Sequence, residues 1–447
     1  MPARKIAYNI LMDIEKNKNY SNLSLNASLS KEKIDDREKG FVTEIVYGVI
    51  EKKRYIDYII NKVSKIKVKK MNYSVKTILR MGVYQIVFLD RVAQYAAINE
   101  SVNMMKKIDK KSSGFVNAVL RNVLRKEEEI TNIDENSIQN IAIKYSYEDW
   151  IIDKIVREHG MARAKEIIRA LSQRPKTYVR INRLKSSEFG SFEKLKEFVI
   201  KSLSDAEIVS REVDYPKEAL EVEHFKGIEK NEMFKKGYIS IQDVSSMLVA
   251  NVVNPEKNSK VLDLCAAPGG KSTHMAEIMD NTGVICSEDI YDHKIKLIEG
   301  YSKRLGIKNI KAKKHNAMDL ENEYIEKFDY VLSDVPCSGM GIVRRKPEIK
   351  YKSESEVNEL PKIQYEILKN AAKYVKKGGV LVYSTCTIFK EENMGVIYKF
   401  LSENSEFMLD SIERVDIEID TLESGYMSIY PDKNDMDGFF ICRMKKI

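Results

Sequence analysis

Residues 261–271 read VLDLCAAPGGK, an apolar strand pattern followed by a turn of small residues and the start of a helix. Small residues in such a turn let a ligand approach the backbone, and the free N–H groups at the helix start attract a negative or electron-rich group. The turn matches neither GxxxxGK[ST] nor GxGxxG, the two common phosphate-binding patterns. Nucleotide phosphates are therefore not the expected ligand.

Strands and helices alternate on both sides of this stretch. GVICSEDI (283–290), FDYVLSDV (328–335) and GGVLVYST (378–385) read as strands separated by helical segments. This alternation predicts a parallel sheet with helices on both faces, in which ligands lie at the carboxyl ends of the strands. We therefore predict a Rossmann-like, doubly wound α/β domain over residues 239–447.

The preceding half of the chain shows a different sequence pattern. Residues 1–130 carry apolar stripes at helical spacing, and a charged and polar stretch at 127–132 marks the candidate boundary. Residues 131–238 combine a helical run with the strand patterns TYVRIN (177–182) and AEIVSREV (206–213). The expected fold is thus multidomain: an all-α domain (1–130), a helical linker plus a small α+β subdomain (131–238), and the α/β domain.

The composition is that of a globular chain, with 43% hydrophobic and 32% charged residues among 447. At roughly 150 residues per domain, this length predicts two or three domains. The chain contains no apolar run of the roughly 18 residues that a membrane span needs, and its first residues lack an apolar secretion-signal core. We expect no membrane partner and a cytoplasmic location.

The five cysteines are odd in number and widely spread, and none forms a CxxC pair. Such a set favours neither a disulfide framework nor a zinc site and fits a reducing compartment. The five histidines are equally scattered, so we expect no metal. The formal net charge of +8 suits a polyanionic partner such as nucleic acid, although lysine-rich helix faces are more often simply solvated.

Asp289 ends the strand that follows the glycine-containing turn. An acidic side chain in that place can accept hydrogen bonds from both hydroxyls of a ribose. Either feature alone has a plain structural explanation, since the glycines could only make a tight turn and Asp289 could only cap the next helix. Together, in this order, they favour an adenosine-type cofactor without phosphates, such as S-adenosylmethionine.

Cys337 and Cys386 each follow a strand pattern that ends at the sheet edge expected to hold the cofactor turn, and Asp334 lies three residues before Cys337. Methylation of carbon 5 of a pyrimidine would use such a cluster, because that carbon becomes nucleophilic only after a thiolate adds to carbon 6. A carboxyl group beside the thiolate can stabilise the charge that develops at ring nitrogen N3. A second thiol could assist release of the product.

The motifs LCAAPGGKSTH, DVPCSGMG and STCT, in this order, resemble the RNA cytosine-5 methyltransferase family. The resemblance implies that Cys386 is the nucleophile, that Cys337 assists release and that Asp334 belongs to the active site. It also implies an S-adenosylmethionine site formed by residues that include Asp289 and Asp334. The others are Cys265, Ala266, Ala267, Pro268, Gly269, Gly270 and Lys271.

The chain departs from the family pattern at one position. Where the family often has an aspartate after the strand that follows Asp289, this sequence has Asn316, with Asp319 as a nearby rival. An asparagine can still accept from the exocyclic amine of adenine and donate to a ring nitrogen. Either Asn316 or Asp319 could therefore contact the adenine.

The resemblance extends over nearly the whole chain. AINESVNMMKK and GFVNAVLRNVLR resemble a NusB-type RNA-binding domain, and RINR, GYISIQDVSS, GIVRRKPEIKY and the closing DGFF fit the same architecture. It implies methylation of one cytosine of bacterial 16S ribosomal RNA. We expect this RNA to be naked or partly assembled, because a mature subunit would limit access for the helical domain. We also expect a monomer that does not act on DNA. Residues 344–346 (RRK) follow the Cys337 loop and are expected to reach RNA phosphates.

Two alternatives compete with this reading. The same chemistry on transfer RNA or 23S ribosomal RNA would need no change in the catalytic motifs. An RNA-binding or ribosome assembly factor, in which the helical domain does the main work and catalysis is incidental, would keep the same domain order.

Overall fold

A computed structural model describes residues 2–17, 25, 28–29, 34–223, 225, 227–413, 415–417, 419 and 421–447. The chain forms two compact units. Unit 1 comprises Met1–Ile168 with Arg345–Glu354, and unit 2 comprises Arg169–Arg344 with Ser355–Ile447. The domain boundaries at residues 130 and 238 stay predictions.

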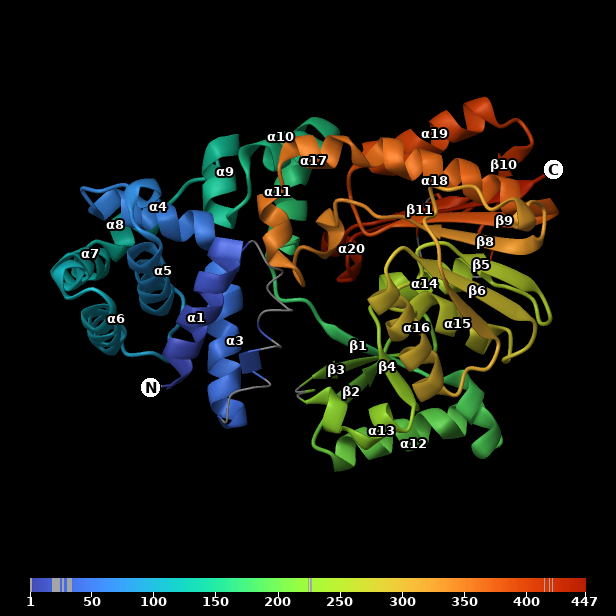
Figure 1. Cartoon of the computed structure of the whole chain (residues 1–447), viewed down its shortest axis with the longest axis horizontal. Helices are drawn as coiled ribbons and strands as arrows, with labels where there is room; N and C mark the ends of the chain where they lie inside the picture. Colours follow the sequence, from blue (N-terminus) through green and yellow to red (C-terminus); the bar gives the residue numbers. More distant parts are fainter. Residues whose placement is uncertain are drawn as a thin grey trace. The chain divides into compact units, whose positions relative to one another are not determined.

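Unit 1 is helical (Figure 1). Its helix α5 (Tyr73–Val87) is buried around most of its circumference, and the buried side chains include the polar residues Thr77, Arg80 and Gln85. The side chain of Asn72 caps its start by accepting a hydrogen bond from the Val75 amide. The helices that form the rest of the unit are α1 (Pro2–Asn17), α3 (Asp36–Glu51), α4 (Lys53–Val63), α6 (Gln94–Ile108), α7 (Ser113–Arg125), α8 (Glu127–Thr131), α9 (Ile138–Tyr145), α10 (Asp149–His159) and most of α11 (Met161–Ala170).

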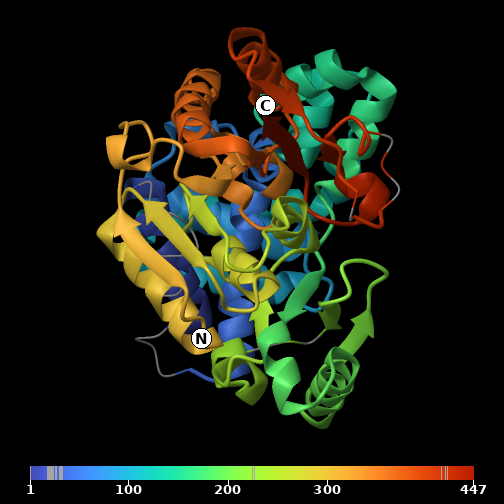
Figure 2. The same cartoon turned by 90° about the vertical axis from the view of Figure 1, so that its right-hand side faces the viewer.

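Unit 2 begins with a small antiparallel sheet in the order β2-β3-β1-β4. Its strands are β1 (Thr177–Ile181), β2 (Val209–Glu212), β3 (Ala219–Glu223) and β4 (Ile239–Ile241). Helix α12 (Phe192–Asp205) packs on one face through Leu195, Val199 and Leu203. This sheet and α12 lie at the lower, green end of unit 2 in Figure 2.

The rest of unit 2 contains an eight-stranded sheet in the order β10-β12-β9-β8-β5-β6-β7, with β11 paired to β12. The five strands from β9 to β7 run parallel, as predicted, and the three C-terminal strands add antiparallel pairs. The strands are β5 (Lys260–Asp263), β6 (Val284–Asp289), β7 (Ile310–Lys314), β8 (Phe328–Asp334), β9 (Val375–Thr385), β10 (Phe407–Leu409), β11 (Tyr426–Ile429) and β12 (Phe439–Lys446).

Helices cover both faces of this sheet, which confirms the doubly wound architecture. Side chains of α14 (Val244–Val253), α15 (Gly270–Ile278) and α16 (Asp292–Leu305) pack on one face, and those of α18 (Leu360–Tyr374) and α19 (Met394–Glu403) on the other. The strand order reverses between β5 and β8. Ligands of open α/β sheets bind outside the carboxyl ends of the strands at such a reversal.

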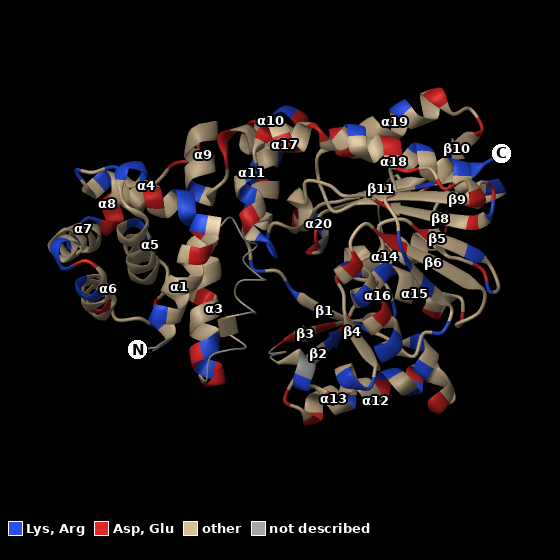
Figure 3. Ribbon diagram, in the orientation of Figure 1, with Lys and Arg blue, Asp and Glu red and all other residues tan. Residues whose placement is uncertain are grey.

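Lysines and arginines are spread over both units and are interspersed with acidic residues (Figure 3). Among the described residues, no helix is long and apolar enough to cross a membrane. Nor do the described residues include a group of three or more His, Cys, Asp or Glu side chains placed to hold a metal ion.

Candidate active site

The turn between β5 and α15 is held in place by contacts with β6 and α16. The amide of Ala266 donates to the carbonyl oxygen of Glu288 at 2.8 Å, which fixes the turn beside β6. Gly269 has a φ of +106°, and a Cβ atom there would lie 3.3 Å from the Cα of Ile298. A larger residue would be strained by this backbone conformation and crowded by α16.

Asp289 lies beside this turn, at the carboxyl end of β6. Its side chain is 5% exposed, and its Oδ2 accepts a hydrogen bond from the Ala267 amide at 3.3 Å. The Nζ atom of Lys294 lies 3.1 Å from Oδ1. The structure thus brings together the turn and the carboxylate that the sequence placed at one sheet edge.

Asn316 and Asp319 follow β7 at the same edge. The amide of His315 donates to the carbonyl oxygen of Asp289 at 3.1 Å, which places Asn316 one residue from that contact. The Nδ2 atom of Asn316 donates to Oδ2 of Asp319 at 3.1 Å. Because the two side chains contact each other, both remain candidates for the adenine contact.

Asp263, the last residue of β5, is a buried carboxyl group that sequence reasoning missed. Its Oδ2 accepts a hydrogen bond from Ser272 Oγ at 2.6 Å, while its Oδ1 has no partner among the described residues. Burial raises the pKa of Asp263 to about 7. The sequence signal was an acidic residue inside an apolar strand, VLDL.

These groups fit an adenosine-type cofactor. A buried oxygen of Asp263 without a partner among the described residues and the buried carboxylate of Asp289 offer acceptors to the N–H and O–H groups of a nucleoside. Gly269 lets the turn pack closely against Ile298 of α16, next to Asp289. Residues 265–271 with Asp289 therefore form the candidate S-adenosylmethionine site.

The two cysteines of the predicted catalytic pair are in contact. Cys337 Sγ and Cys386 Sγ lie 3.3 Å apart. They meet because β8 and β9 are parallel neighbours in which Asp334 faces Ser384, so that the loops after both strands leave the same edge. The Gly341 amide of the first loop also donates to the carbonyl oxygen of Cys386 at 3.0 Å.

Close backbone packing fixes the loop that carries Cys337. The Gly438 amide donates to the carbonyl oxygen of Gly341 at 3.0 Å. A Cβ atom on Gly341 would lie 1.9 Å from the carbonyl oxygen of Gly438. Glycine is required at this contact because no side chain fits between the two backbones, and the closing motif DGFF thereby becomes part of the site.

Asp334 is held between Lys271 and Ser384. The Nζ atom of Lys271 donates to Oδ2 of Asp334 at 2.6 Å, and Ser384 Oγ donates to Oδ1 at 2.6 Å. Sequence reasoning assigned Lys271 to the cofactor turn. The structure shows that its ammonium group reaches the predicted catalytic aspartate, so this side chain joins the two parts of the site.

The charges around the two thiols differ in sign. Burial opposes a charge on Lys271, but Asp334 and the Cys386 thiolate raise its pKa, so the ammonium form is kept beside Cys386. The hydrogen bond with Cys386, burial, and the charges of Cys386 and Glu392 raise the pKa of the Cys337 thiol. The Cys337 thiol therefore holds its proton more firmly than an ordinary cysteine does.

Arg344 does not present its side chain to solvent. Only 1% of the side chain is exposed, and Nη2 donates to the carbonyl oxygen of Met436 at 2.6 Å and lies 3.3 Å from Oδ1 of Asp437. The phosphate contact expected of this residue is therefore not available in this structure. For Arg345 and Lys346 the expectation stays a prediction.

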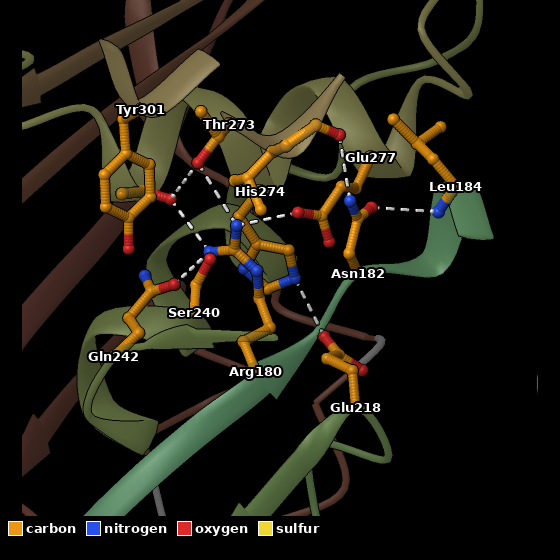
Figure 4. A network of polar contacts seen from close by, with 12 residues as sticks. Arg180, Asn182, Leu184, Glu218, Ser240, Gln242, Thr273, His274, Glu277 and Tyr301 are labelled. Atoms are coloured by element: carbon orange, nitrogen blue, oxygen red, sulfur yellow. Dashed lines mark hydrogen bonds and ion pairs between the residues drawn. The ribbon is translucent and has the colours of Figure 1, made fainter. Parts of the chain in front are cut away.

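A buried polar network supports the cofactor helix from the side of the small sheet (Figure 4). Arg180 of β1 donates to the carbonyl oxygen of Gly270 at 2.9 Å, to Thr273 Oγ1 at 3.1 Å and to Glu277 Oε1 at 2.8 Å, and it also contacts Gln242. These contacts join the small sheet to the first and last turns of α15.

His274 of the same helix is also part of this network. Its Nε2 lies 2.8 Å from Oε1 of Glu218, which stands next to β3 in the small sheet. Both side chains are buried. The small sheet and the eight-stranded part of unit 2 are thus connected through α15 at several points.

Comparisons with known proteins agree with this geometry. A family model described as 16S rRNA methyltransferase RsmB/F matches residues 250–445, and the NusB family matches residues 1–125. The probable ribosomal RNA small subunit methyltransferase B of Bacillus subtilis (strain 168) is 36% identical, covering 99% of this chain and 98% of the relative. That of Synechocystis sp. (strain PCC 6803) is 31% identical, with 99% of both chains covered.

The solved structures include a similar protein over the full length. The crystal structure of PH0851 is 26% identical, covers 100% of this chain and 99% of its own, and superposes with a TM-score of 0.81. The matches to both curated relatives cover 99% of this chain. The chain therefore belongs to the ribosomal RNA small subunit methyltransferase B family, and it is an S-adenosylmethionine-dependent RNA methyltransferase.

Proposed function

We propose that this enzyme methylates carbon 5 of one cytosine in 16S ribosomal RNA through a transient bond between Cys386 and carbon 6 of the base. The observation that carries the proposal is the contact between Cys337 and Cys386, 3.3 Å apart and next to the Lys271–Asp334 pair. A methyltransferase acting on an exocyclic nitrogen or a ribose hydroxyl would need no thiol, because those atoms are nucleophiles already.

Each side chain has a role in this reaction. The Cys386 thiolate, beside the Lys271 ammonium, adds to carbon 6 and pushes electrons towards carbon 5. The Lys271–Asp334 pair hydrogen-bonds ring nitrogen N3, where negative charge develops. S-adenosylmethionine, bound by residues 265–271 and Asp289, supplies the methyl group. The candidate adenine contacts are Asn316 and Asp319.

Product release needs the second thiol. A water molecule takes the proton from carbon 5, the electrons of that C–H bond restore the double bond between carbons 5 and 6, and the bond from carbon 6 to sulfur breaks so that the sulfur of Cys386 leaves as a thiolate. Cys337 keeps its proton and donates a hydrogen bond to the departing sulfur of Cys386, which stabilises that sulfur as an anion. Without Cys337 the covalent intermediate should persist.

Substitution of each cysteine tests the proposal. Incubation with radiolabelled S-adenosylmethionine and total ribosomal RNA, followed by mapping of the modified base, should give 5-methylcytosine in 16S ribosomal RNA. Cys386→Ala should abolish methylation, and Cys337→Ala should leave a protein–RNA adduct that survives denaturing electrophoresis. Cys286→Ala, on β6 outside the site, should behave like the parent. Methylation by Cys386→Ala would overturn the proposal.

The substrate can be assigned in the same assay. Transfer RNA and 23S ribosomal RNA should accept far less methyl than 16S ribosomal RNA, because the small-subunit RNA is the substrate in the names of the relatives. We expect free 16S ribosomal RNA to exceed finished subunits, since a buried cytosine must first leave its stack to reach the thiol. If cells that carry Cys386→Ala show full function, the role of an RNA-binding or assembly factor would instead be favoured.

A further inference from the structure

Glu392 connects the two cysteine loops through one carboxylate. Its Oε2 accepts a hydrogen bond from the Ser338 amide at 2.8 Å, and its Oε1 accepts one from Thr387 Oγ1 at 3.3 Å. Ser338 directly follows Cys337, and Thr387 directly follows Cys386. The two hydroxyl groups of Ser338 and Thr387 also contact each other at 2.7 Å. The carboxylate thus binds the residue next to each reactive sulfur.

The surroundings of this carboxylate are neutral. Glu392 is 1% exposed, and its third hydrogen-bond donor is the side-chain amide of Gln364 at 2.9 Å. All three side-chain contacts come from an amide or a hydroxyl group, so no positive charge balances the buried carboxylate among the described residues. A buried charge without a counter-charge is costly, and proteins retain one mainly where it has a specific task.

The position of this charge relative to the thiols suggests the task. Lys271 places a positive charge beside Cys386, whereas Glu392 places a negative charge close to Cys337. Two thiols in contact could each give up a proton, and the catalytic cycle needs the same one to do so each time. A positive charge on the side of Cys386 and a negative charge on the side of Cys337 favour the thiolate at Cys386.

We propose that Glu392 is a positioning residue that holds the two cysteine loops in register and keeps the proton on Cys337, so that Cys386 is always the nucleophile. This inference rests on the proposed function. The carboxylate acts through its contacts with Ser338, Thr387 and Gln364 and through the electrostatic field at the sulfur of Cys337. Within the described part of the chain, no hydrogen bond joins it to the cofactor turn or to Asp289.

The neighbouring Asn393 holds the loop that carries Cys386. Its Oδ1 accepts from Thr385 Oγ1 at 2.6 Å, and its Nδ2 donates to the carbonyl oxygen of Thr387 at 3.1 Å. These contacts hold the backbone on either side of Cys386. The backbone around Cys386 is therefore held by two adjacent side chains, Glu392 and Asn393. Of these two, only Glu392 is charged and contacts both cysteine loops.

Glu392→Gln separates charge from shape. The amide keeps one oxygen for the Ser338 amide and can donate to Thr387, so the loops should stay together while the charge is lost. We expect kcat to fall by about tenfold and the alkaline limb of its pH profile to move to lower pH, because Cys337 then loses its proton more easily. The KM for S-adenosylmethionine should stay within about twofold, since the cofactor turn is untouched.

Glu392→Ala removes the clamp as well, and kcat should fall by about 100-fold. Glu391→Gln is the matched control: it removes the same charge from the neighbouring exposed side chain and should leave both kcat and the pH profile unchanged. Binding of S-adenosylmethionine, measured by calorimetry, shows that each variant is folded. If Glu392→Ala does not fold, the pH profile of Glu392→Gln still decides.

The outcomes separate this inference from the proposed function. If Cys386→Ala retains methylation, the proposed function fails whatever Glu392 does. If Cys386→Ala is inactive while Glu392→Gln has the parental kcat and the parental pH profile, only the inference about Glu392 is overturned. A uniform loss of kcat in Glu392→Gln without a shift of the alkaline limb would leave a packing role and would also overturn the proton-retaining role.

Discussion

Arg180→Met should destabilise unit 2 more than the loss of its hydrogen bonds alone would predict. The side chains of Arg180 and Glu277 are both fully buried, and Arg180 Nη2 lies 2.8 Å from Glu277 Oε1. The other carboxylate oxygen of Glu277 already lacks a hydrogen-bond partner among the described residues. Methionine fills similar space but leaves the Glu277 charge buried without a counter-charge.

The magnitude follows from that stranded charge. Breaking a buried ion pair by removing one partner costs about 3–5 kcal/mol. For a folding unit of this size, each kcal/mol lowers the melting temperature by roughly 2–4 °C. Arg180→Met should therefore melt about 6–20 °C below the parent. The KM for S-adenosylmethionine should also rise, because the Gly270 carbonyl loses the donor that fixes the start of α15.

The double variant Arg180→Met/Glu277→Leu tests the cause. With both charges removed, the buried site becomes apolar, and such replacements are often neutral in stability. We expect the double variant to melt well above Arg180→Met, with a coupling free energy of at least about 2 kcal/mol in a double-mutant cycle. Denaturant unfolding of the full chain, followed by circular dichroism, gives the four free energies. Additive losses in the two single variants would refute the argument.

Three further outcomes are expected. Burial, together with the charge of Arg180, lowers the pKa of His274, so the unfolded chain binds this proton first and the stability falls as the pH drops through about 6.5. The melting temperature of His274→Gln should therefore fall less between about pH 7.5 and pH 5.5 than that of the parent. The control His293→Gln, which changes an exposed histidine, should behave like the parent. Gly341→Ala should reduce kcat by at least about tenfold, because the added methyl group collides with a facing carbonyl beside the cysteines, while Gly300→Ala, where the space is open, should be silent in the same methylation assay. Burial lowers the pKa of Lys350 in unit 1 to about 7. Lys350→Met should therefore raise the free energy of unfolding by about 1–3 kcal/mol near pH 7, as measured by denaturant titration. This gain in stability should shrink as the pH approaches about 10, because the lysine of the unfolded chain then also loses its proton.

The sequence predicted which residues reach the functional edge of the sheet. Asp289, Cys337 and Cys386 all follow strand patterns, and parallel strands deliver the loops after them to one edge. The two thiols could be expected to meet for that reason, and their sulfur atoms lie 3.3 Å apart in the structure. The pattern could not show the second role of Lys271. Its ammonium group donates a hydrogen bond to Asp334, outside the cofactor turn.

Buried charges were missed because their partners are distant in the sequence. Glu392 stands in a charged run, KEEN, that reads as an exposed turn, and only its contact with Ser338, 54 residues earlier, reveals its role. Asp263 stands out in the sequence only as an acidic residue within VLDL, and the structure shows that one of its oxygens has no partner among the described residues. Periodicity indicates which face of an element is apolar, but it does not indicate which polar groups are enclosed with it.

The strand TYVRIN shows why a correct periodicity can still mislead. The alternation was correct, since Val179 and Ile181 face the core formed with α12. A polar face in such a strand is expected to meet water, because antiparallel sheets commonly bury one side only. Here the other face is covered by α15, so Arg180 is completely buried and its pairing with Glu277 becomes a condition for docking the small sheet. An arginine at an outward position of a strand beside a cofactor helix is therefore better tested as a buried ion pair than assumed to be a surface charge.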